Sequence, residues 1–360
     1  MNKKGLLGID FFLIFPVAIL VLISLVTLLS INLSFFRSQL IFLIVSSLAF
    51  LFFSQSNYQI LKIYSKPIYI LSLILLALVF FLGVESRGAA RWYDFFGLRV
   101  QFSEILKPFL AISFASYVIN KKTYSFRSLL EIFLLLAPIA LLIFLQPDLG
   151  SALIYIGIVL TATFFLGFSL KYYVGLVLPI LAILPVFWRF LHDYQRQRVI
   201  TFFSGGVDPL GSSYNVIQSI IAVGSGMIMG KGLGQGTQSG LRFLPERQTD
   251  FIFATISEQL GFVGTIIILL CFAFFLYKIY SIYINSNDKF CKIFSVITFF
   301  AFLIQIFVNI GMNIGIVPIV GVTLPFVSYG GSSLLSNFIF LGFLSAINKG
   351  GKDNDVLEIR

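Results

Sequence analysis

A single aspartate, Asp250, marks the boundary between a long polar segment and an apolar stretch, in the run LPERQTDFIFATISEQLG over residues 244–261. A charged side chain at a bilayer edge is costly unless it has a partner or a chemical task, so this position is a candidate site. A carboxylate there can act as a general base toward a sugar hydroxyl. It can also cap the following helix, or leave that task to Thr249 and sit in the first turn. The sequence leaves these interpretations open.

A second set of polar groups lies inside apolar stretches. Glu104 and Lys107 are three residues apart, so they share one helix face. They form either a self-neutralising buried pair or the lining of a polar cavity in which Lys107 offers a cation to a phosphate. Glu258 follows Asp250 by eight residues, which places it two turns deeper and roughly 80° around the helix. We expect Glu258 to form hydrogen bonds inside the bundle.

Two further candidates lie in short connecting segments. Arg91, in RGAARW, belongs with Arg87 and Arg99 to a cluster of cations that suggests anions nearby. The planar guanidinium suits phosphate recognition, and placing the loop against lipid headgroups is the alternative. Asp148, in QPDLG, is either a turn-former or a polar ligand.

The glycine-rich run GMIMGKGLGQGTQSG over 226–240 resembles a nucleotide-binding loop only superficially. Lys231 is followed by Gly232 and not by Ser or Thr, and the GxGxxG pattern is also missing. Tight turns, or backbone N–H groups that cup an anion, explain these glycines better. The tract PIVGVTLPFVSYGGSS over 318–333 predicts a broken or re-entrant segment, which membrane proteins tolerate where backbone lines a cavity.

Composition identifies the class of protein. Of 360 residues, 58% are hydrophobic and only 11% are charged, and 43 are Phe. A soluble domain has roughly 25% charged residues. One helical crossing of a bilayer takes about 20 apolar residues. We therefore predict an all-α polytopic membrane protein with about ten transmembrane helices. The predicted spans are Phe11–Ile31, Leu40–Phe53 (extended by Phe35, Phe36 and flanking residues), Ile68–Val84, Ser103–Ile119, Leu129–Leu145, Leu149–Leu170, Tyr172–Trp188, Phe251–Tyr277, Ile293–Gly315 and Phe326–Ile347.

The distribution of Lys and Arg predicts that both termini lie in the cytoplasm. Residues 1–360 then form one integral membrane domain, with a large extracytoplasmic loop over 189–250 and a cytoplasmic tail over 348–360. Within the loop, apolar residues with helical spacing over 214–223 predict a helix that lies in the interface or packs back onto the protein. His192 is the only histidine, which excludes sites built from several histidines.

Seven motifs follow one another in a fixed order along the chain. They are GAARW, QFSEILK, QPDLGSA, QSIIAVGSG, GKGLGQGTQS, FLPERQTDFIFA and PIVGVTLPFVSYGGSS. Together they resemble the SEDS family (shape, elongation, division and sporulation proteins), from about Gly88 to the end of the tenth span. The motif GTQS-x-L-x-FLPE is more similar to that of the elongation branch, RodA, than to that of the division branch, FtsW. Two positions depart from the family pattern, Phe102 in QFSE and Gln259 after Glu258.

The resemblance implies a peptidoglycan glycosyltransferase that polymerises lipid II into β-1,4-linked strands during elongation and rod-shape maintenance. Its essential aspartate falls on Asp250, its membrane Glu–Lys pair on Glu104 and Lys107, and its arginine on Arg91. We expect Asp250 to be the general base of an inverting reaction. We expect Arg91, Glu104, Lys107, Asp148 and Glu258 to contact substrate.

The resemblance also implies a divalent cation, Mg²⁺ or Mn²⁺, with ligands that the sequence does not identify, and no nucleotide, haem or flavin. The expected partners are lipid II, undecaprenyl-pyrophosphate-linked glycan, a class B penicillin-binding protein, elongation-complex proteins and membrane lipid, but no nucleic acid. The expected location is the bacterial inner membrane, with the active site on its outer face.

Three alternatives belong to other classes or branches. A transporter that flips lipid-linked precursor would also use intramembrane charges and a broken helix. A scaffold that only docks a transpeptidase would leave the polar cluster unexplained. A division or sporulation member of the same family would share the chemistry.

Overall fold

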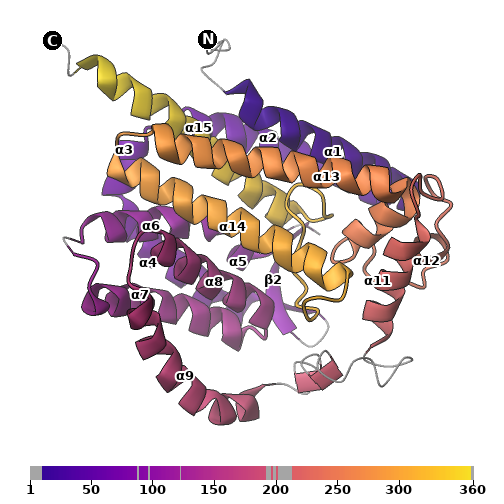
Figure 1. Ribbon diagram of the computed structural model, residues 1–360, viewed down its shortest axis with the longest axis horizontal. Helices are drawn as coiled ribbons and strands as arrows, with labels where there is room; N and C mark the ends of the chain where they lie inside the picture. Colours follow the sequence, from indigo (N-terminus) through magenta and orange to yellow (C-terminus); the bar gives the residue numbers. More distant parts are fainter. Residues whose placement is uncertain are drawn as a thin grey trace.

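Helices dominate the computed structural model (Figure 1). The residues that it describes are 10–86, 89–95, 98–121, 123–191, 196–197, 200–201 and 213–357. Arg87 and His192 therefore lie outside the described residues. So does most of the predicted loop between residues 192 and 212. The helices are α1 (Phe11–Ile31), α2 (Leu33–Ser54), α3 (Tyr58–Ile63), α4 (Ser65–Leu82), α5 (Phe102–Ile105), α6 (Lys107–Ile119), α7 (Phe126–Leu145), α8 (Leu149–Phe165), α9 (Leu170–Phe190), α11 (Tyr214–Ser225), α12 (Thr237–Gly240), α13 (Ile252–Asn285), α14 (Lys289–Asn313) and α15 (Gly331–Leu357).

Within the described part of the chain, seven helices are long and apolar enough to cross a membrane: α1, α2, α4, α7, α13, α14 and the part of α15 from Gly331 to Lys349. Two shorter apolar helices, α6 and α8, accompany them. The polytopic helical architecture is confirmed. Each of the ten predicted stretches overlaps a helix, and the number of crossings stays a prediction.

Several predicted boundaries are wrong; α13, for example, continues to Asn285, eight residues beyond the predicted end at Tyr277. α8 ends at Phe165 and does not reach Leu170, because the chain turns at Gly167 with φ 102°. α15 begins at Gly331 and not at Phe326, which itself has φ 63° in the irregular segment. α4 ends at Leu82, two residues before the predicted end of the third span.

The central helices form one packed bundle (Figure 1). α13 lies between α1 and α14, and α2 runs along α15. Aromatic rings fill the interior, among them Phe302, which stacks on Phe326 with ring centroids 5.5 Å apart. α11 packs against α13 and α14, so the helix predicted from the spacing over 214–223 is confirmed and lies on the protein. α9 runs outside the bundle (Figure 1).

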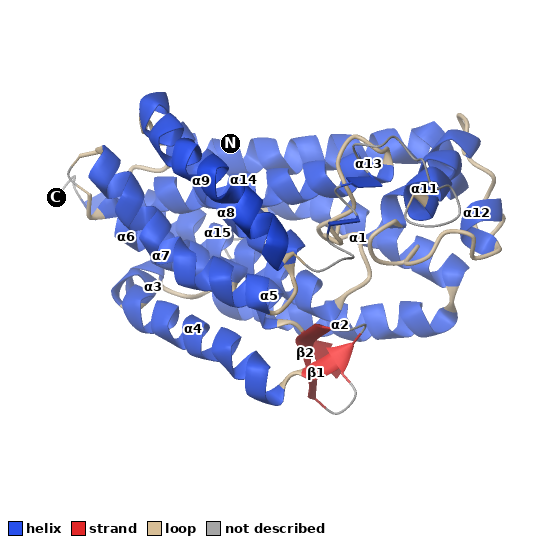
Figure 2. Cartoon of the chain, turned by 90° about the horizontal axis from the view of Figure 1, so that it is seen from below, coloured by secondary structure: helices blue, strands red, loops and turns tan. Residues whose placement is uncertain are grey.

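A small antiparallel sheet departs from the all-α prediction. Strands β1 (Val84–Ser86), β2 (Ala89–Phe95) and β3 (Leu98–Val100) pair in the order β1-β2-β3. The sheet lies beside the end of α4 (Figure 2). Its strands are three to seven residues long, too short for a clear alternation of apolar and polar residues. The sheet matters because it carries Arg91.

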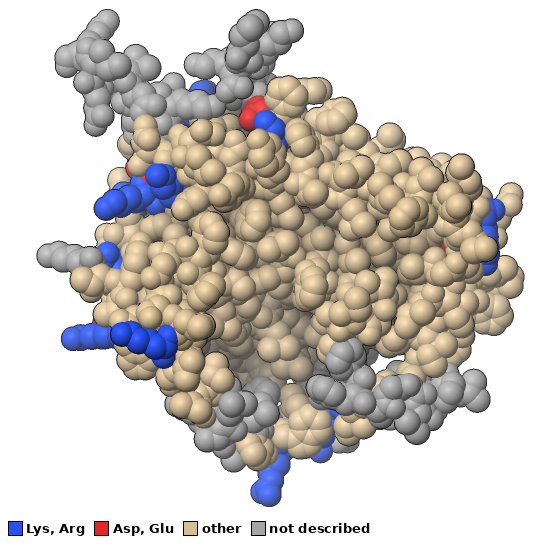
Figure 3. All heavy atoms as spheres, viewed as in Figure 1, with Lys and Arg blue, Asp and Glu red and all other residues tan. Residues whose placement is uncertain are grey.

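The outer surface of the bundle is largely apolar. On the face shown in Figure 3, the central area is almost without charge, and Lys and Arg lie toward the edges. Large apolar side chains are exposed along several helices, including Leu270 of α13 and Phe52 of α2. Such a surface is stable only where lipid covers it, which is the arrangement expected of a multi-pass membrane protein.

α13 is broken at one residue. Gly261 has φ 66° and ψ −162°, a conformation that is essentially restricted to glycine. A Cβ at this position would lie 2.3 Å from the amide nitrogen of Gly230. The break therefore divides α13 into a segment before Gly261 and a longer segment after it.

Replacing Gly261 with alanine is expected to destabilise the protein by about 2–3 kcal/mol, because the side chain meets both a forbidden conformation and a backbone clash. Gly224→Ala is the matched control, since nothing lies within 4 Å of a Cβ there. Thermal unfolding of the two detergent-solubilised variants measures the difference. Equal melting temperatures would show that the break is not strained.

Candidate functional site

Asp250 lies in the turn immediately before α13. The N-cap position is Phe251, so neither Asp250 nor Thr249 occupies it. Instead, the backbone carbonyl of Asp250 accepts hydrogen bonds from the side-chain amides of Asn309 (3.1 Å) and Asn313 (3.0 Å). These bonds fix the backbone of Asp250 without using its carboxylate.

The two asparagines belong to a buried polar stripe on α14 that the sequence analysis missed. Gln305, Asn309 and Asn313 are four residues apart, at most 1% exposed, and face the same side of the helix. The amide oxygen of Asn313 also accepts from the backbone of Ala254, in the first turn of α13 (3.0 Å). Amide side chains repeated every four residues in an apolar span were the available signal, because each buried amide needs partners.

The tract over 318–333 completes the surroundings of Asp250. As predicted, it is a break between helices: the chain is irregular from Ile314 to Gly330. The hydroxyl of Ser328 donates to the carbonyl of Thr249 (2.7 Å), and the amide of Tyr329 donates to the carbonyl of Gln248 (2.9 Å). Gly321 has φ 71°, and a Cβ there would lie 3.5 Å from Oδ2 of Asp250. The carboxylate therefore faces this tract.

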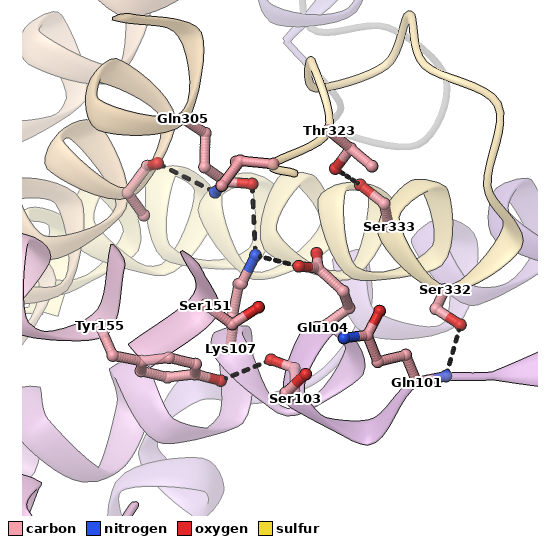
Figure 4. A network of polar contacts seen from close by, with 12 residues as sticks. Gln101, Ser103, Glu104, Lys107, Ser151, Tyr155, Gln305, Thr323, Ser332 and Ser333 are labelled. Atoms are coloured by element: carbon pink, nitrogen blue, oxygen red, sulfur yellow. Dashed lines mark hydrogen bonds and ion pairs between the residues drawn. The ribbon is translucent and has the colours of Figure 1, made fainter. Parts of the chain in front are cut away.

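Glu104 and Lys107 form a buried ion pair (Figure 4). Lys107 Nζ lies 2.7 Å from Glu104 Oε1 and 3.3 Å from Gln305 Oε1 on α14. The lysine side chain is only 3% exposed and the glutamate side chain 11%. Because Gln305 is one helical turn from Asn309, the α14 stripe connects this pair with the backbone of Asp250.

Arg91 of β2 and Asp148, at the start of α8, form an ion pair. Arg91 Nη1 lies 3.8 Å from Asp148 Oδ1. Gln101 Nε2 donates to Asp148 Oδ2 (2.8 Å), and the amide and hydroxyl of Ser151 also donate to this carboxylate (3.1 and 2.8 Å). Asp148 is thus the N-cap of α8 and its oxygens are occupied by protein donors. Arg91 keeps 29% of its side chain exposed and remains able to reach a ligand.

Glu258 lies in a different cluster, and its partners come from the glycine-rich run. Its side chain is fully buried, and its carboxylate accepts from the backbone amides of Gln238 and Ser239, both at 2.8 Å. The hydroxyl of Thr237 (3.2 Å) and Nζ of Lys231 (3.3 Å) also donate to it. The anion cupped by this run is therefore the protein's own glutamate. Glu258 forms hydrogen bonds as expected, but with this run and not inside the bundle.

Glu258→Gln is expected to cost about 2–3 kcal/mol, because the new NH₂ group faces backbone donors and a charged hydrogen bond is lost. Lys231→Met is the matched control. It removes one of the four donors, and that side chain is 29% exposed, so it is expected to cost about 1 kcal/mol or less. Thermal unfolding of both variants shows which substitution lowers stability more. A larger loss for Lys231→Met would show that the backbone amides are not the main anchor.

Arg247 is a further cation near Asp250 that the sequence analysis passed over. Its Nη1 donates to the carbonyl of Gly240 (3.3 Å). Burial, together with the like charge of Arg242, lowers the pKa of its guanidinium from the usual value. The segment before Asp250 is thus positively charged, although an arginine stays protonated at neutral pH even with a lowered pKa.

The described residues do not form a metal cage. Among them there is no group of three or more His, Cys, Asp or Glu side chains that could hold an ion. Glu104, Asp148 and Glu258 are each engaged by protein donors. Mg²⁺, however, commonly binds through one or two carboxylates together with substrate phosphates. The donor set therefore fits an ion that arrives with a phosphorylated ligand.

The structure joins four predicted residues in two pairs, Arg91 with Asp148 and Glu104 with Lys107. All the partners of Glu258 described above come from 231–239.

A cavity of about 400 Å³ lies elsewhere, lined by Tyr58, Gln59, Lys62, Ile63, Ser65, Ser116, Asn120 and Asp288. Asp288 is the N-cap of α14, whereas Asn309 and Asn313, which bind the backbone of Asp250, lie about 30–37 Å further along the same helix. The cavity is not part of the site.

The fold and the site define a multi-pass helical membrane protein with a polar site at the head of a broken helix. A family model described as "Cell cycle protein", for FtsW, RodA and SpoVE, matches residues 5–352. The chain belongs to this family, the SEDS proteins, as its motifs indicated.

Individual relatives come from several branches of the family. The chain is 39% identical over 284 residues to the peptidoglycan glycosyltransferase MrdB of Escherichia coli (strain K12), covering 78% of this chain and 76% of that protein. It is 35% identical over 318 residues to the probable peptidoglycan glycosyltransferase FtsW of Geobacter metallireducens, covering 86% and 84%. It is 33% identical over 332 residues to stage V sporulation protein E of Bacillus subtilis (strain 168), covering 88% and 87%.

Solved structures agree with this assignment. A chain in "Structural coordination of polymerization and crosslinking by a peptidoglycan synthase complex" superposes with a TM-score of 0.83 at 30% identity, covering 95% of this chain and 98% of that one. The rod shape determining protein RodA of Thermus thermophilus gives a TM-score of 0.70 at 26% identity, covering 94% and 96%.

Proposed function

We propose that this chain is a peptidoglycan glycosyltransferase that polymerises lipid II into β-1,4-linked glycan strands during cell elongation. Membership of the family and the likeness to MrdB and RodA support the activity and the elongation role. The single observation that carries the mechanism is the position of Asp250. Its backbone is held by Asn309 and Asn313, and its carboxylate faces the irregular tract over 318–333.

In the proposed reaction, Asp250 acts as the general base. It removes the proton from the 4-hydroxyl of GlcNAc in lipid II as that oxygen attacks C1 of MurNAc at the end of the growing strand. The C1–O bond to undecaprenyl pyrophosphate breaks, and the pyrophosphate leaves with the bonding electrons. One displacement converts the α-linked donor into a β-1,4 bond, so the configuration inverts.

The leaving group carries several negative charges and needs cations near it. Arg91 is suited to this task, because its guanidinium is partly exposed and its only carboxylate contact described above is at 3.8 Å. Lys107 is already neutralised by Glu104 at 2.7 Å, so it has less charge to offer. We assign pyrophosphate contact first to Arg91. Lys107, Glu104, Asp148 and Glu258 would shape the surrounding site.

A divalent cation, Mg²⁺ or Mn²⁺, is proposed to enter with the substrate pyrophosphate, whose charge it would neutralise. The described carboxylates support this view, since three of them are occupied by protein donors and Asp250 faces the region where substrate would bind. Chelation of the cation by EDTA is then expected to stop polymerisation without lowering the melting temperature of the free protein.

The proposed partner and cellular location follow from the same comparisons. One structural neighbour comes from a complex that combines polymerisation and crosslinking. A class B penicillin-binding protein is therefore the proposed partner, together with other proteins of the elongation complex. The proposed location is the bacterial inner membrane, with both termini in the cytoplasm and Asp250 on the outer face, where lipid-linked sugars are available.

Polymerisation of purified lipid II tests the proposal. The wild-type protein in detergent, with Mg²⁺ or Mn²⁺ and its cognate transpeptidase, is expected to produce glycan strands that a gel resolves. The same preparation in vesicles containing labelled lipid II tests the transporter alternative. Movement of label across the bilayer without strand formation would overturn the proposal and favour a flippase.

A further inference from the structure

The residues Met227, Ile228 and Met229 form a projecting apolar tip in the connection between α11 and α12. Their exposed fractions are 78%, 64% and 78%. Three consecutive apolar side chains with this exposure are unfavourable in water, and methionine adapts readily to an irregular apolar environment.

The tip and the residues just after it are attached to α13 at its break by four backbone hydrogen bonds, two of them to the tip itself. In an unbroken helix, the amides of residues 262 and 263 would donate to the carbonyls of residues 258 and 259. Here the amides of Phe262 and Val263 donate to the carbonyls of Met227 (2.9 Å) and Ile228 (3.2 Å). The freed carbonyls of Glu258 and Gln259 accept from the next residues of the run, Lys231 (2.9 Å) and Gly232 (3.0 Å).

Glycines make this close approach possible. A Cβ on Gly226 would lie 1.9 Å from the carbonyl oxygen of Ser257, and a Cβ on Gly230 would lie 2.2 Å from that of Gln259. The segment over 226–232 therefore fits into the helix break in one register. Because both its amides and its carbonyls are paired there, the position of the tip along α13 is fixed.

That position coincides with the start of the apolar outer surface of α13. Residues 252–259 are all buried in the protein, whereas Phe262 and Val263 are 60% and 44% exposed. The helix from Phe262 to Asn285 has 24 residues and is about 36 Å long, enough for one crossing. The end of α1 lies at the same level, since Ser30 Oγ donates to Gln259 Oε1 (2.8 Å). A bilayer that covers this helix would have its edge at about the level of the break.

We propose that Met227–Met229 is a membrane anchor that inserts its side chains among the acyl chains of the lipids at this bilayer edge. The tip continues the lipid-facing surface of α13, to which it is hydrogen-bonded. The anchor sets the height of the following segment, which includes the Glu258 contacts and ends at Asp250. Beyond the break the chain turns back toward the bundle, since Ser328 binds the carbonyl of Thr249 while the carbonyl of Val327 accepts from Ser24, well inside α1.

Depth-dependent fluorescence quenching tests this anchor. The background variant carries Cys271→Ala and Cys291→Ala, which removes both cysteines. A single cysteine at Ile228 is labelled with bimane, and the protein is placed in vesicles whose lipids carry a nitroxide on the acyl chain. Labels at Met227 and Met229 repeat the measurement, so that one distorted variant does not decide it.

Two control positions calibrate the signal. Leu270, 63% exposed on α13, reports direct contact with acyl chains. Gln235 is exposed on the same connection but lies beyond the hydrogen-bonded segment, and it reports water. Labels on the tip are expected to reach at least about half the quenching seen at Leu270 and to resist aqueous iodide.

Each other outcome overturns the proposal. Strong quenching by iodide with little quenching by the lipid nitroxide would place the tip in water. Protection from both quenchers would show that protein covers the tip, whether from this chain or from a partner. Because the readout does not involve activity, failure here leaves the proposed glycosyltransferase function untouched.

Discussion

Asp250→Asn is expected to reduce strand synthesis from lipid II by roughly 10²–10⁴-fold, the usual contribution of a general base. The substitution keeps the shape of the side chain but removes its ability to take a proton. The backbone contacts to Asn309 and Asn313 use the carbonyl of Asp250, so they are retained and the fold should be unchanged. The measurement is the initial rate of polymerisation, with wild type and variant matched for amount and melting temperature.

Asp288→Asn is the matched control for this experiment. Asp288 caps α14 by accepting from the amide of Phe290 (2.6 Å), and asparagine caps a helix about equally well. It lies at the opposite end of α13, so its rate should stay within about twofold of wild type. Strands produced at the wild-type rate by Asp250→Asn would keep the enzyme but remove Asp250 as its base.

Lys107→Met is expected to lower the free energy of unfolding by about 3–5 kcal/mol, because it leaves the carboxylate of Glu104 buried without its counter-ion. Glu104→Gln removes the other partner and should cost a comparable amount. The double variant Glu104→Gln/Lys107→Met contains neither charge and is expected to recover much of this loss. Thermal unfolding in detergent gives the three values, and the double-mutant cycle gives the coupling between the two residues.

The rate of polymerisation then separates the two interpretations of this pair. If the pair only stabilises the bundle, the double variant regains activity together with stability. If Lys107 also contacts the pyrophosphate, the double variant regains stability but stays inactive. Single variants that unfold at the wild-type temperature would contradict the buried ion pair itself.

The long helices could be predicted from sequence because each depends mainly on local composition. Stretches such as Phe11–Ile31 are apolar for longer than any buried soluble helix needs, and the predicted span and α1 agree at both ends. The same reasoning located the break over 318–333, where two prolines and a glycine pair come close together, although single prolines lie inside α1 and α7. It failed at the end of α8, where Gly167 stops the helix within an apolar run.

The pairing of polar side chains could not be predicted because it depends on contacts between distant segments. Glu104 and Lys107 are three residues apart, so their pairing follows from helix geometry. Nothing local indicates that Gln305 joins them from α14, or that Arg91 meets Asp148 across a small sheet. Glu258 is the clearest case: it lies in a predicted membrane span, but its partners are backbone amides about twenty residues earlier.

The sequence by itself therefore determined the class of protein, the main helices and the identity of the candidate aspartate, since these depend on composition, period and motif. Only the tertiary structure decided what holds that aspartate in place. The side-chain amides of Asn309 and Asn313 bind its backbone carbonyl, and Ser328 and Tyr329 bind the carbonyls of the two residues before it. The acceptors are backbone carbonyls, which every residue type has. Such contacts leave almost no trace in a single sequence and become visible only when the chain is folded.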